Sequence, residues 1–376
     1  MQLTNTLLLT CCLALLLTAC SDGSDNPPER VPEYDFSTVD ARLQQFLDES
    51  DRYDGISVTL VDRLQGTVHE AAFGDHATDI VVMLASVSKV PSASLLMALD
   101  DDASLDYDID APIERYLPWP GVYGDRTSGQ LVSNTSGIPG LASAANYGPH
   151  LCQYATAWQL QDCARLIYAW ELPDTEPPDT SWDYGGSQWH LAAAVAEVVS
   201  NSSWRQAFDD YIAGPCQLEV FQYGNMWEDL TRWNGHPDSL EGLDNPSIEG
   251  GAISNLQDYA KLLLMHLNGG VCGETRVLSE ESVAAMRVDR GGKHGEPYGL
   301  GWWIVPAEDG GEPYLFWDPG AFGSVVWLDT ARMIGGFVAI DVYTSIGAPE
   351  PIRLVMNDII PLVAQAVDEA RLAAGD

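Results

Sequence analysis

The sequence predicts an α+β fold, of the broad α/β class, with an antiparallel sheet formed from both ends of the chain. Residues 56–61 and 67–73 alternate or run apolar around a turn, which is typical of a β-hairpin. Residues 322–328 and 336–342 are two further strand-like runs near the other end. The stretch between these pairs is mainly helical in pattern. It is therefore predicted to form an inserted all-helical lobe, while other helices flank the sheet.

Apolar residues at helical spacing, and the prolines and glycines that end such runs, place the helices. The predicted helices cover residues 86–99, 111–118, 159–170, 189–199, 256–267 and 351–372. We assign one catalytic domain to residues 36–376. Its sheet lobe covers about 36–105 and 246–376, and its helical lobe covers about 106–245.

Composition and charge limit the classes of function. The chain has 376 residues, and its hydrophobic content of 46% is typical of a globular protein rather than a disordered one. The formal net charge is −37 at pH 7. A surface this acidic repels nucleic acid, so we expect no nucleic-acid partner.

The amino-terminal segment has the features of an export signal. Residues 7–17 form an apolar core that is too short to span a bilayer. The sequence L-T-A-C at 17–20 resembles the lipobox of bacterial lipoproteins, which implies a signal peptide at 1–19 and a lipid-bearing Cys20. An ordinary secretory signal is the alternative. Residues 20–35 are then expected to be a flexible tether, and the protein a lipoprotein of the bacterial cell envelope that faces the periplasm.

Export also bears on the cysteines, because disulfides form in oxidising compartments. Four cysteines lie beyond the predicted anchor, which is an even number. We favour Cys152–Cys163, which closes a short loop, and Cys216–Cys272, although the sequence leaves the other two pairings open. Their spacing matches no metal site, and we predict no metal centre.

Ser86 and Lys89 are the candidate nucleophile and its base. They are three residues apart, so in a helix they share one face. A serine hydroxyl is a weak nucleophile near neutral pH, and a lysine with a lowered pKa can take its proton. The pair alone is a weak signal, because an isolated S-x-x-K is usually a surface lysine after a helix-start serine.

Further segments strengthen that signal. The chain resembles the serine β-lactamase and penicillin-recognising hydrolase superfamily, in its class C-like and carboxylesterase branch, from about residue 36 to the last helix. The segments that carry the resemblance are A-S-V-S-K at 85–89, L-V-S-N-T-S-G-I-P at 131–139, G-G-A-I-S-N at 250–255 and Y-G-L-G-W at 298–302. The resemblance implies a β-lactamase-like fold. Asn134 stands where the family usually has histidine.

The resemblance also implies a tyrosine that takes the serine proton and returns it to the leaving group. In the family this tyrosine begins a Y-x-N motif. Tyr184-Gly185-Gly186 is the best match because a predicted helix follows it, and Tyr147 is a rival. Gly186 lies at a substrate-binding position of the family but lacks the amide that positions substrate and lysine there.

The family's third motif, K-T-G or H-x-G on a strand, has its nearest match in Asp318-Pro319-Gly320. The resemblance implies that the backbone N–H groups of Ser86 and Ala321 form the oxyanion hole. Asp318 and Gly320 are the implied substrate-binding residues. An aspartate at 318 would repel a substrate carboxylate unless it is protonated or paired.

These features predict an exported serine hydrolase that acts on a small-molecule ester or amide through a Ser86 acyl-enzyme and needs no cofactor. A carboxylesterase with little β-lactamase activity is favoured. The alternatives are a D,D-peptidase, a small-amide hydrolase, or a non-catalytic cell-envelope binding protein of the same fold.

Overall fold

The computed structural model describes residues 31–225, 227, 230, 233–240, 244–343 and 346–375. The predicted signal peptide, Cys20 and most of the predicted tether lie outside the described residues. Residues 31–35 are described and carry no helix or strand. Among the described helices, none combines the length and the apolar character needed to cross a membrane.

The main sheet joins the two ends of the chain, as the sequence predicts. Its strand order is β2-β1-β11-β10-β9-β8, and all neighbouring pairs are antiparallel. The strands are β1 (Gly55–Asp62), β2 (Gly66–Gly74), β8 (Trp303–Val305), β9 (Leu315–Pro319), β10 (Gly323–Asp329) and β11 (Ile334–Asp341). The pairing of β1 with β11, from Ser57 opposite Ala339 to Asp62 opposite Ile334, closes the sheet.

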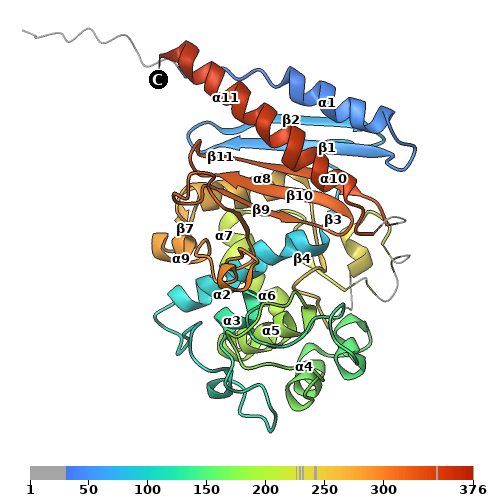
Figure 1. The fold of residues 1–376 in the computed structure, drawn as a ribbon, viewed down its shortest axis with the longest axis vertical. Coiled ribbons are helices and arrows are strands. Elements are labelled where there is room, and N and C mark those ends of the chain that lie inside the picture. Colours follow the sequence, from blue (N-terminus) through green and yellow to red (C-terminus); the bar gives the residue numbers. More distant parts are fainter. Residues whose placement is uncertain are drawn as a thin grey trace, which may run out of the picture.

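Helices cover both faces of this sheet (Figure 1). Alternate residues of β1, such as Ile56, Val58 and Leu60, pack in one core with α1 (Ser37–Asp48) and α11 (Ile360–Ala374). The larger core lies on the opposite face. It contains α2 (Lys89–Asp101), α8 (Leu256–Leu267) and most of the buried helical lobe.

The lower part of Figure 1 is the helical lobe, with α3 (Ser128–Val132), α4 (Leu160–Ala169), α5 (Gly186–Ser200) and α6 (Trp204–Phe208). The other helices are α7 (Gly214–Cys216), α9 (Glu280–Ala285) and α10 (Glu350–Leu354), and α10 packs in the core with β1 and α11. A small sheet, in the order β3-β5-β4, lies between the lobe and the main sheet; its strands are β3 (Val82–Met83), β5 (Ala252–Ser254) and β4 (Gln222–Tyr223). β6 (Val271–Cys272) and β7 (Thr275–Arg276) form a separate pair.

The predicted helix around Ser86 needs correction. Residues Ala85–Ser88 form a single 3₁₀ turn, and the α-helix begins at Lys89. The predicted helix at 189–199 begins earlier, at Gly186. The predicted helix at 351–372 contains a π-helical turn, Val355–Ile359, between α10 and α11. Short elements such as β3 and β8 escaped prediction because two or three residues show no periodicity.

Candidate active site

Ser86 lies in a strained turn between β3 and α2. The preceding Ala85 has a φ of +46°, a left-handed backbone angle that is unusual for a residue with a side chain. Ala85 and Val87 are buried, whereas Ser86 is only partly buried. The turn therefore presents the Ser86 hydroxyl at the surface of an otherwise packed segment, and such strain is common at functional sites.

Lys89, the first residue of α2, directs its amine at that hydroxyl. Its Nζ lies 3.1 Å from Ser86 Oγ and donates a second hydrogen bond, of 2.7 Å, to the carbonyl oxygen of Glu249. Burial lowers the pKa of Lys89 to about 8, although the nearby carboxyls of Asp318 and Glu249 favour the ammonium. A substantial fraction of this lysine can therefore be neutral near physiological pH and able to accept a proton.

Tyr184 supplies the second hydrogen bond to the nucleophile, with its hydroxyl 2.8 Å from Ser86 Oγ. Lys89 Nζ lies 4.6 Å from the centroid of the Tyr184 ring. Burial, together with the negative charge of Asp318, raises the pKa of Tyr184 well above its ordinary value. Tyr184 is therefore a neutral phenol that can donate a proton. The rival Tyr147 instead accepts a hydrogen bond from the backbone N–H of Ser187, 3.2 Å away.

Asn134 holds the segment that carries Tyr184. Its Oδ1 accepts hydrogen bonds from Gln188 Nε2 at 3.0 Å and Trp189 Nε1 at 3.1 Å, and its carbonyl accepts one from the N–H of Asp183. Asn134 adopts a φ of +60°, which asparagine tolerates better than most residues. The replacement of the family's usual histidine thus has a structural role next to Tyr184.

The backbone amides of Ser86 and Ala321 remain the predicted oxyanion hole. Within the described residues, neither N–H donates a hydrogen bond to another protein group. Gly320 brings the end of β9 against the serine turn, because a Cβ there would lie only 2.3 Å from the carbonyl oxygen of Leu84. Gly320 therefore permits close backbone approach, and it is itself buried.

Asp318 is also fully buried, and neither carboxyl oxygen has a hydrogen-bond partner among the described residues. Burial raises the pKa of Asp318 well above its ordinary value, although Lys89 opposes the shift. The carboxyl lies close enough to Lys89 and Tyr184 to affect the pKa of both. Direct contact of Asp318 with substrate stays a prediction, and the structure adds that this side chain is buried.

Gly186 is the third position at which a direct substrate contact was expected, and it too is buried. A Cβ at Gly186 would lie 2.2 Å from Gln153 Oε1 and 2.6 Å from Glu249 Oε1. Sequence reasoning missed Gln153 and Glu249. The only sequence signal for Glu249 is that it directly precedes the G-G-A-I-S-N segment.

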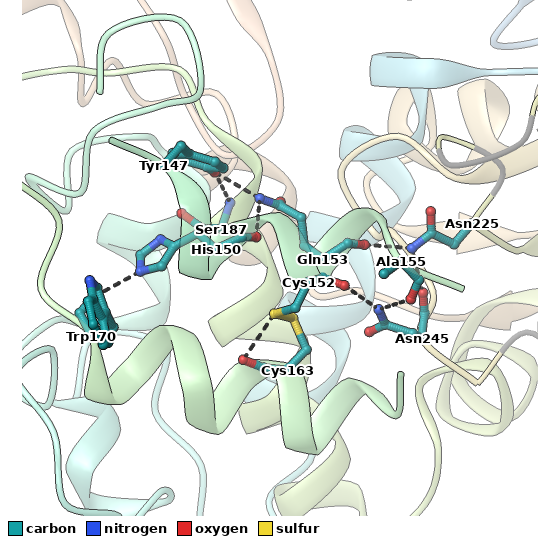
Figure 2. Close-up of a disulfide and its surroundings, with 10 residues drawn as sticks. All are labelled: Tyr147, His150, Cys152, Gln153, Ala155, Cys163, Trp170, Ser187, Asn225 and Asn245. Carbon is teal, nitrogen blue, oxygen red and sulfur yellow. Dashed lines mark hydrogen bonds between the residues drawn. A yellow bond between two sulfur atoms is a disulfide. The ribbon is translucent and has the colours of Figure 1, made fainter. Parts of the chain in front are cut away.

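Both disulfides form as favoured from the sequence, Cys152–Cys163 and Cys216–Cys272. Figure 2 shows the first beside a network of polar side chains. Asn245 Nδ2 donates to the carbonyl of Cys152 at 2.9 Å, and Asn225 Nδ2 donates to the carbonyl of Gln153. The disulfide therefore anchors the segment that delivers Gln153 to Gly186.

The tryptophans singled out by the sequence differ in how deeply they are buried. Trp189 and Trp302 are fully buried. Trp182 and Trp303 are only partly buried, and the Trp303 ring stacks on Tyr184 with a centroid separation of 6.0 Å. In the part of the chain that the structure describes, no cluster of three or more metal-ligating residues occurs.

The geometry can be compared with known proteins. The Beta-lactamase family profile matches residues 39–360. Penicillin-binding protein 4 of Amycolatopsis lactamdurans is 27% identical over 242 residues, covering 59% of this chain and 60% of that protein. The chain thus spans about three fifths of this curated relative.

Solved structures show the same fold. A β-lactamase-like protein from Bacteroides dorei has a TM-score of 0.70 and 25% identity, over 89% of this chain and 99% of that one. A family VIII carboxylesterase has a TM-score of 0.67 and 20% identity, over 89% of this chain and 98% of that one. With most of its length covered by the family profile, this chain belongs to the Beta-lactamase family of serine hydrolase folds.

Proposed function

We propose that this protein is a serine hydrolase that cleaves a neutral carboxylic ester through an acyl-enzyme on Ser86. One observation carries the proposal: Lys89 Nζ and Tyr184 OH both lie within hydrogen-bond distance of Ser86 Oγ, at 3.1 and 2.8 Å. A nucleophile held by a base and a proton donor is the arrangement that acyl transfer needs.

In the proposed reaction, neutral Lys89 takes the proton of Ser86 as Oγ attacks the ester carbonyl carbon. The amides of Ser86 and Ala321 bind the resulting oxyanion. The carbon–oxygen bond to the alcohol then breaks, and Tyr184 passes a proton to the departing oxygen while Lys89 returns one to Tyr184. Water attacks the acyl-enzyme, gives its proton to the same pair and releases the carboxylic acid. Ser86 recovers its proton, so the cycle closes.

The surroundings of Ser86 favour an ester without a carboxylate. Among the described residues, Lys89 is the only cation that hydrogen-bonds Ser86, and buried Asp318 stands where the family's K-T-G or H-x-G motif has lysine or histidine. Aromatic rings lie next to Tyr184 and next to Ala321. Trp303 stacks on Tyr184, and Trp227 stacks on Phe322, the residue after Ala321. These rings suit an apolar acyl group.

The test compares two substrates in the wild type and in Ser86→Ala. We expect turnover of p-nitrophenyl butyrate that is lost in Ser86→Ala, and turnover of the carboxylate-bearing β-lactam nitrocefin at least about 100-fold slower, because no cation offsets its charge. Comparable turnover of nitrocefin would contradict the substrate assignment. Turnover of D-alanyl peptides or small amides, with no ester hydrolysis, would favour the D,D-peptidase or amide-hydrolase alternative.

We also propose that the protein is a lipoprotein of the bacterial cell envelope, anchored at Cys20 and facing the periplasm. The lipobox-like sequence at 17–20 supports the anchor. The pairing of Cys152 with Cys163 and of Cys216 with Cys272 supports an oxidising compartment. Radiolabelled palmitate should be incorporated by the wild type and not by Cys20→Ser. Equal labelling, or none in either, would contradict the anchor.

A further inference from the structure

The space beside Gly186 is filled by side chains from two other segments. Gln153 Oε1 and Glu249 Oε1 lie only 2.2 and 2.6 Å from where a Cβ of residue 186 would stand. Real side chains do not approach a Cβ so closely, so the volume that an asparagine at 186 would need is already occupied. The amide that the resemblance leads one to expect at this position is thus replaced by polar groups that arrive from elsewhere in the fold.

Glu249 reaches both Gly186 and the catalytic lysine. Its carbonyl oxygen accepts the 2.7 Å hydrogen bond from Lys89 Nζ, while its side chain extends over Gly186, two residues after Tyr184. The turn before β5 that carries Glu249 is tied to α2, because Ser92 Oγ donates to the carbonyl of Ile248 at 2.6 Å. The Glu249 side chain therefore lies between the segment that holds the lysine and the segment that holds the tyrosine.

The carboxyl of Glu249 is buried, and neither of its oxygens has a hydrogen-bond partner among the described residues. A buried carboxyl without a hydrogen-bond partner destabilises the fold, and such groups are rare in folded proteins. Its neighbour Gln153 has an unpartnered Oε1 as well. Both groups converge on the same point beside Gly186.

Gln153 is held rigidly in this place (Figure 2). Its Nε2 donates to Tyr147 OH at 2.8 Å and to the carbonyl of His150 at 3.1 Å, so its Oε1 is the end left toward Gly186. The adjacent Cys152 is linked to Cys163 by the disulfide. Two hydrogen bonds therefore hold the Gln153 side chain in place next to the Glu249 carboxyl.

We propose that Glu249, backed by Gln153, substitutes for the missing side chain at Gly186 and is a positioning residue for Lys89. This inference rests on the proposed hydrolysis at Ser86 and deepens it. The Glu249 side chain keeps the lysine amine within reach of Ser86 Oγ by filling the space into which the amine could otherwise move. It also places a carboxyl beside the amine whose protonation governs the reaction.

The first test removes the side chains of Gln153 and Glu249 and then restores an amide at residue 186. In Gln153→Ala/Glu249→Ala the support is absent, and we expect kcat for p-nitrophenyl butyrate to fall about 100-fold, since small misplacement of a reacting group has effects of that size. KM should change much less. Adding Gly186→Asn to that variant refills the space with an amide, and kcat should recover about tenfold through the coupling of adjacent sites. Wild-type kcat in the double variant, or a folded triple variant without recovery, would overturn the proposal.

The second test uses Glu249→Gln, which keeps size and hydrogen-bonding capacity and so should fold. The titratable groups around Glu249 are Lys89 from α2, Tyr184, and Tyr147 and Tyr154 from the segment of Gln153. Asp318 from β9 acts on Lys89 and Tyr184 as well. The carboxyl of Glu249 raises the pKa of Lys89, so its removal should move the acid limb of kcat/KM to lower pH. A side chain with only a packing role would leave that limb in place.

The outcomes also separate this inference from the function on which it rests. If folded wild-type protein neither hydrolyses the ester nor reacts with a fluorophosphonate probe, the proposed function fails. If the wild type does both, and Glu249→Gln has an unshifted acid limb, the function stands and the role of Glu249 is overturned. A shifted limb together with recovery in the triple variant supports the proposal.

Discussion

The acid limb of the pH–rate profile follows directly from the burial of Lys89. Burial lowers the pKa of this lysine to about 8, and only the neutral amine can take the proton of Ser86. Below the pKa the neutral fraction falls about tenfold for each pH unit. We therefore expect kcat/KM at about pH 6 to be about 100-fold below its alkaline plateau.

The assay is initial-rate hydrolysis of p-nitrophenyl butyrate over about pH 5.5 to 9.5, read at a wavelength where both forms of p-nitrophenol absorb equally. Protein held at each pH and returned to neutral buffer must recover full activity, which excludes unfolding as the cause of the limb. A flat profile between about pH 6 and 9 would refute the assignment of neutral Lys89 as the base. A limb below about pH 5 would indicate a carboxylate base instead.

The other predictions concern single groups. Tyr184→Phe should lower kcat by about 100-fold or more with little change in thermal stability, because it removes only the proton donor; an unchanged kcat would exclude that role. Asp318→Asn should move the acid limb to lower pH, since the carboxyl favours the Lys89 ammonium, and a limb that moves upward would contradict this. Gly320→Ala should destabilise the protein by about 1–3 kcal/mol and lower kcat, because the new methyl meets the Leu84 carbonyl; urea unfolding and ester kinetics check both effects. Replacing Cys216–Cys272 by serines should cost about 4 kcal/mol and Cys152–Cys163 about 3 kcal/mol, since their sequence separations are 56 and 11; the reverse order in urea unfolding would count against this loop-length argument.

The sequence was sufficient to predict the architecture because the strongest signals are local. The alternation of Ile56, Val58 and Leu60 marks a strand, and the runs near the other end mark its partners. The pairing of both ends in one sheet is confirmed by the structure. Helix α1 was missed even though Val39, Leu43 and Phe46 lie on one helical face, so its signal was present and was overlooked.

In the site, too, local sequence patterns predicted some residues and missed others. Ser86 and Lys89 are adjacent in sequence, and Tyr184 was chosen over Tyr147 because a helix follows it; the structure brings these three together. The burial of Asp318 and the positions of Gln153 and Glu249 depend on contacts between distant segments. No local pattern shows that the side chains of residues 153 and 249 meet over Gly186.

The central claim is that Ser86 is a nucleophile activated by Lys89 and Tyr184. Its most direct test is the intact mass of the folded protein after reaction with a fluorophosphonate probe, for the wild type, Ser86→Ala and Lys89→Met. We predict one adduct on the wild type, none on Ser86→Ala, and labelling slowed by at least about 100-fold in Lys89→Met, because the hydroxyl then lacks its base. An adduct that persists in Ser86→Ala, or no adduct on active wild-type protein, would contradict the account.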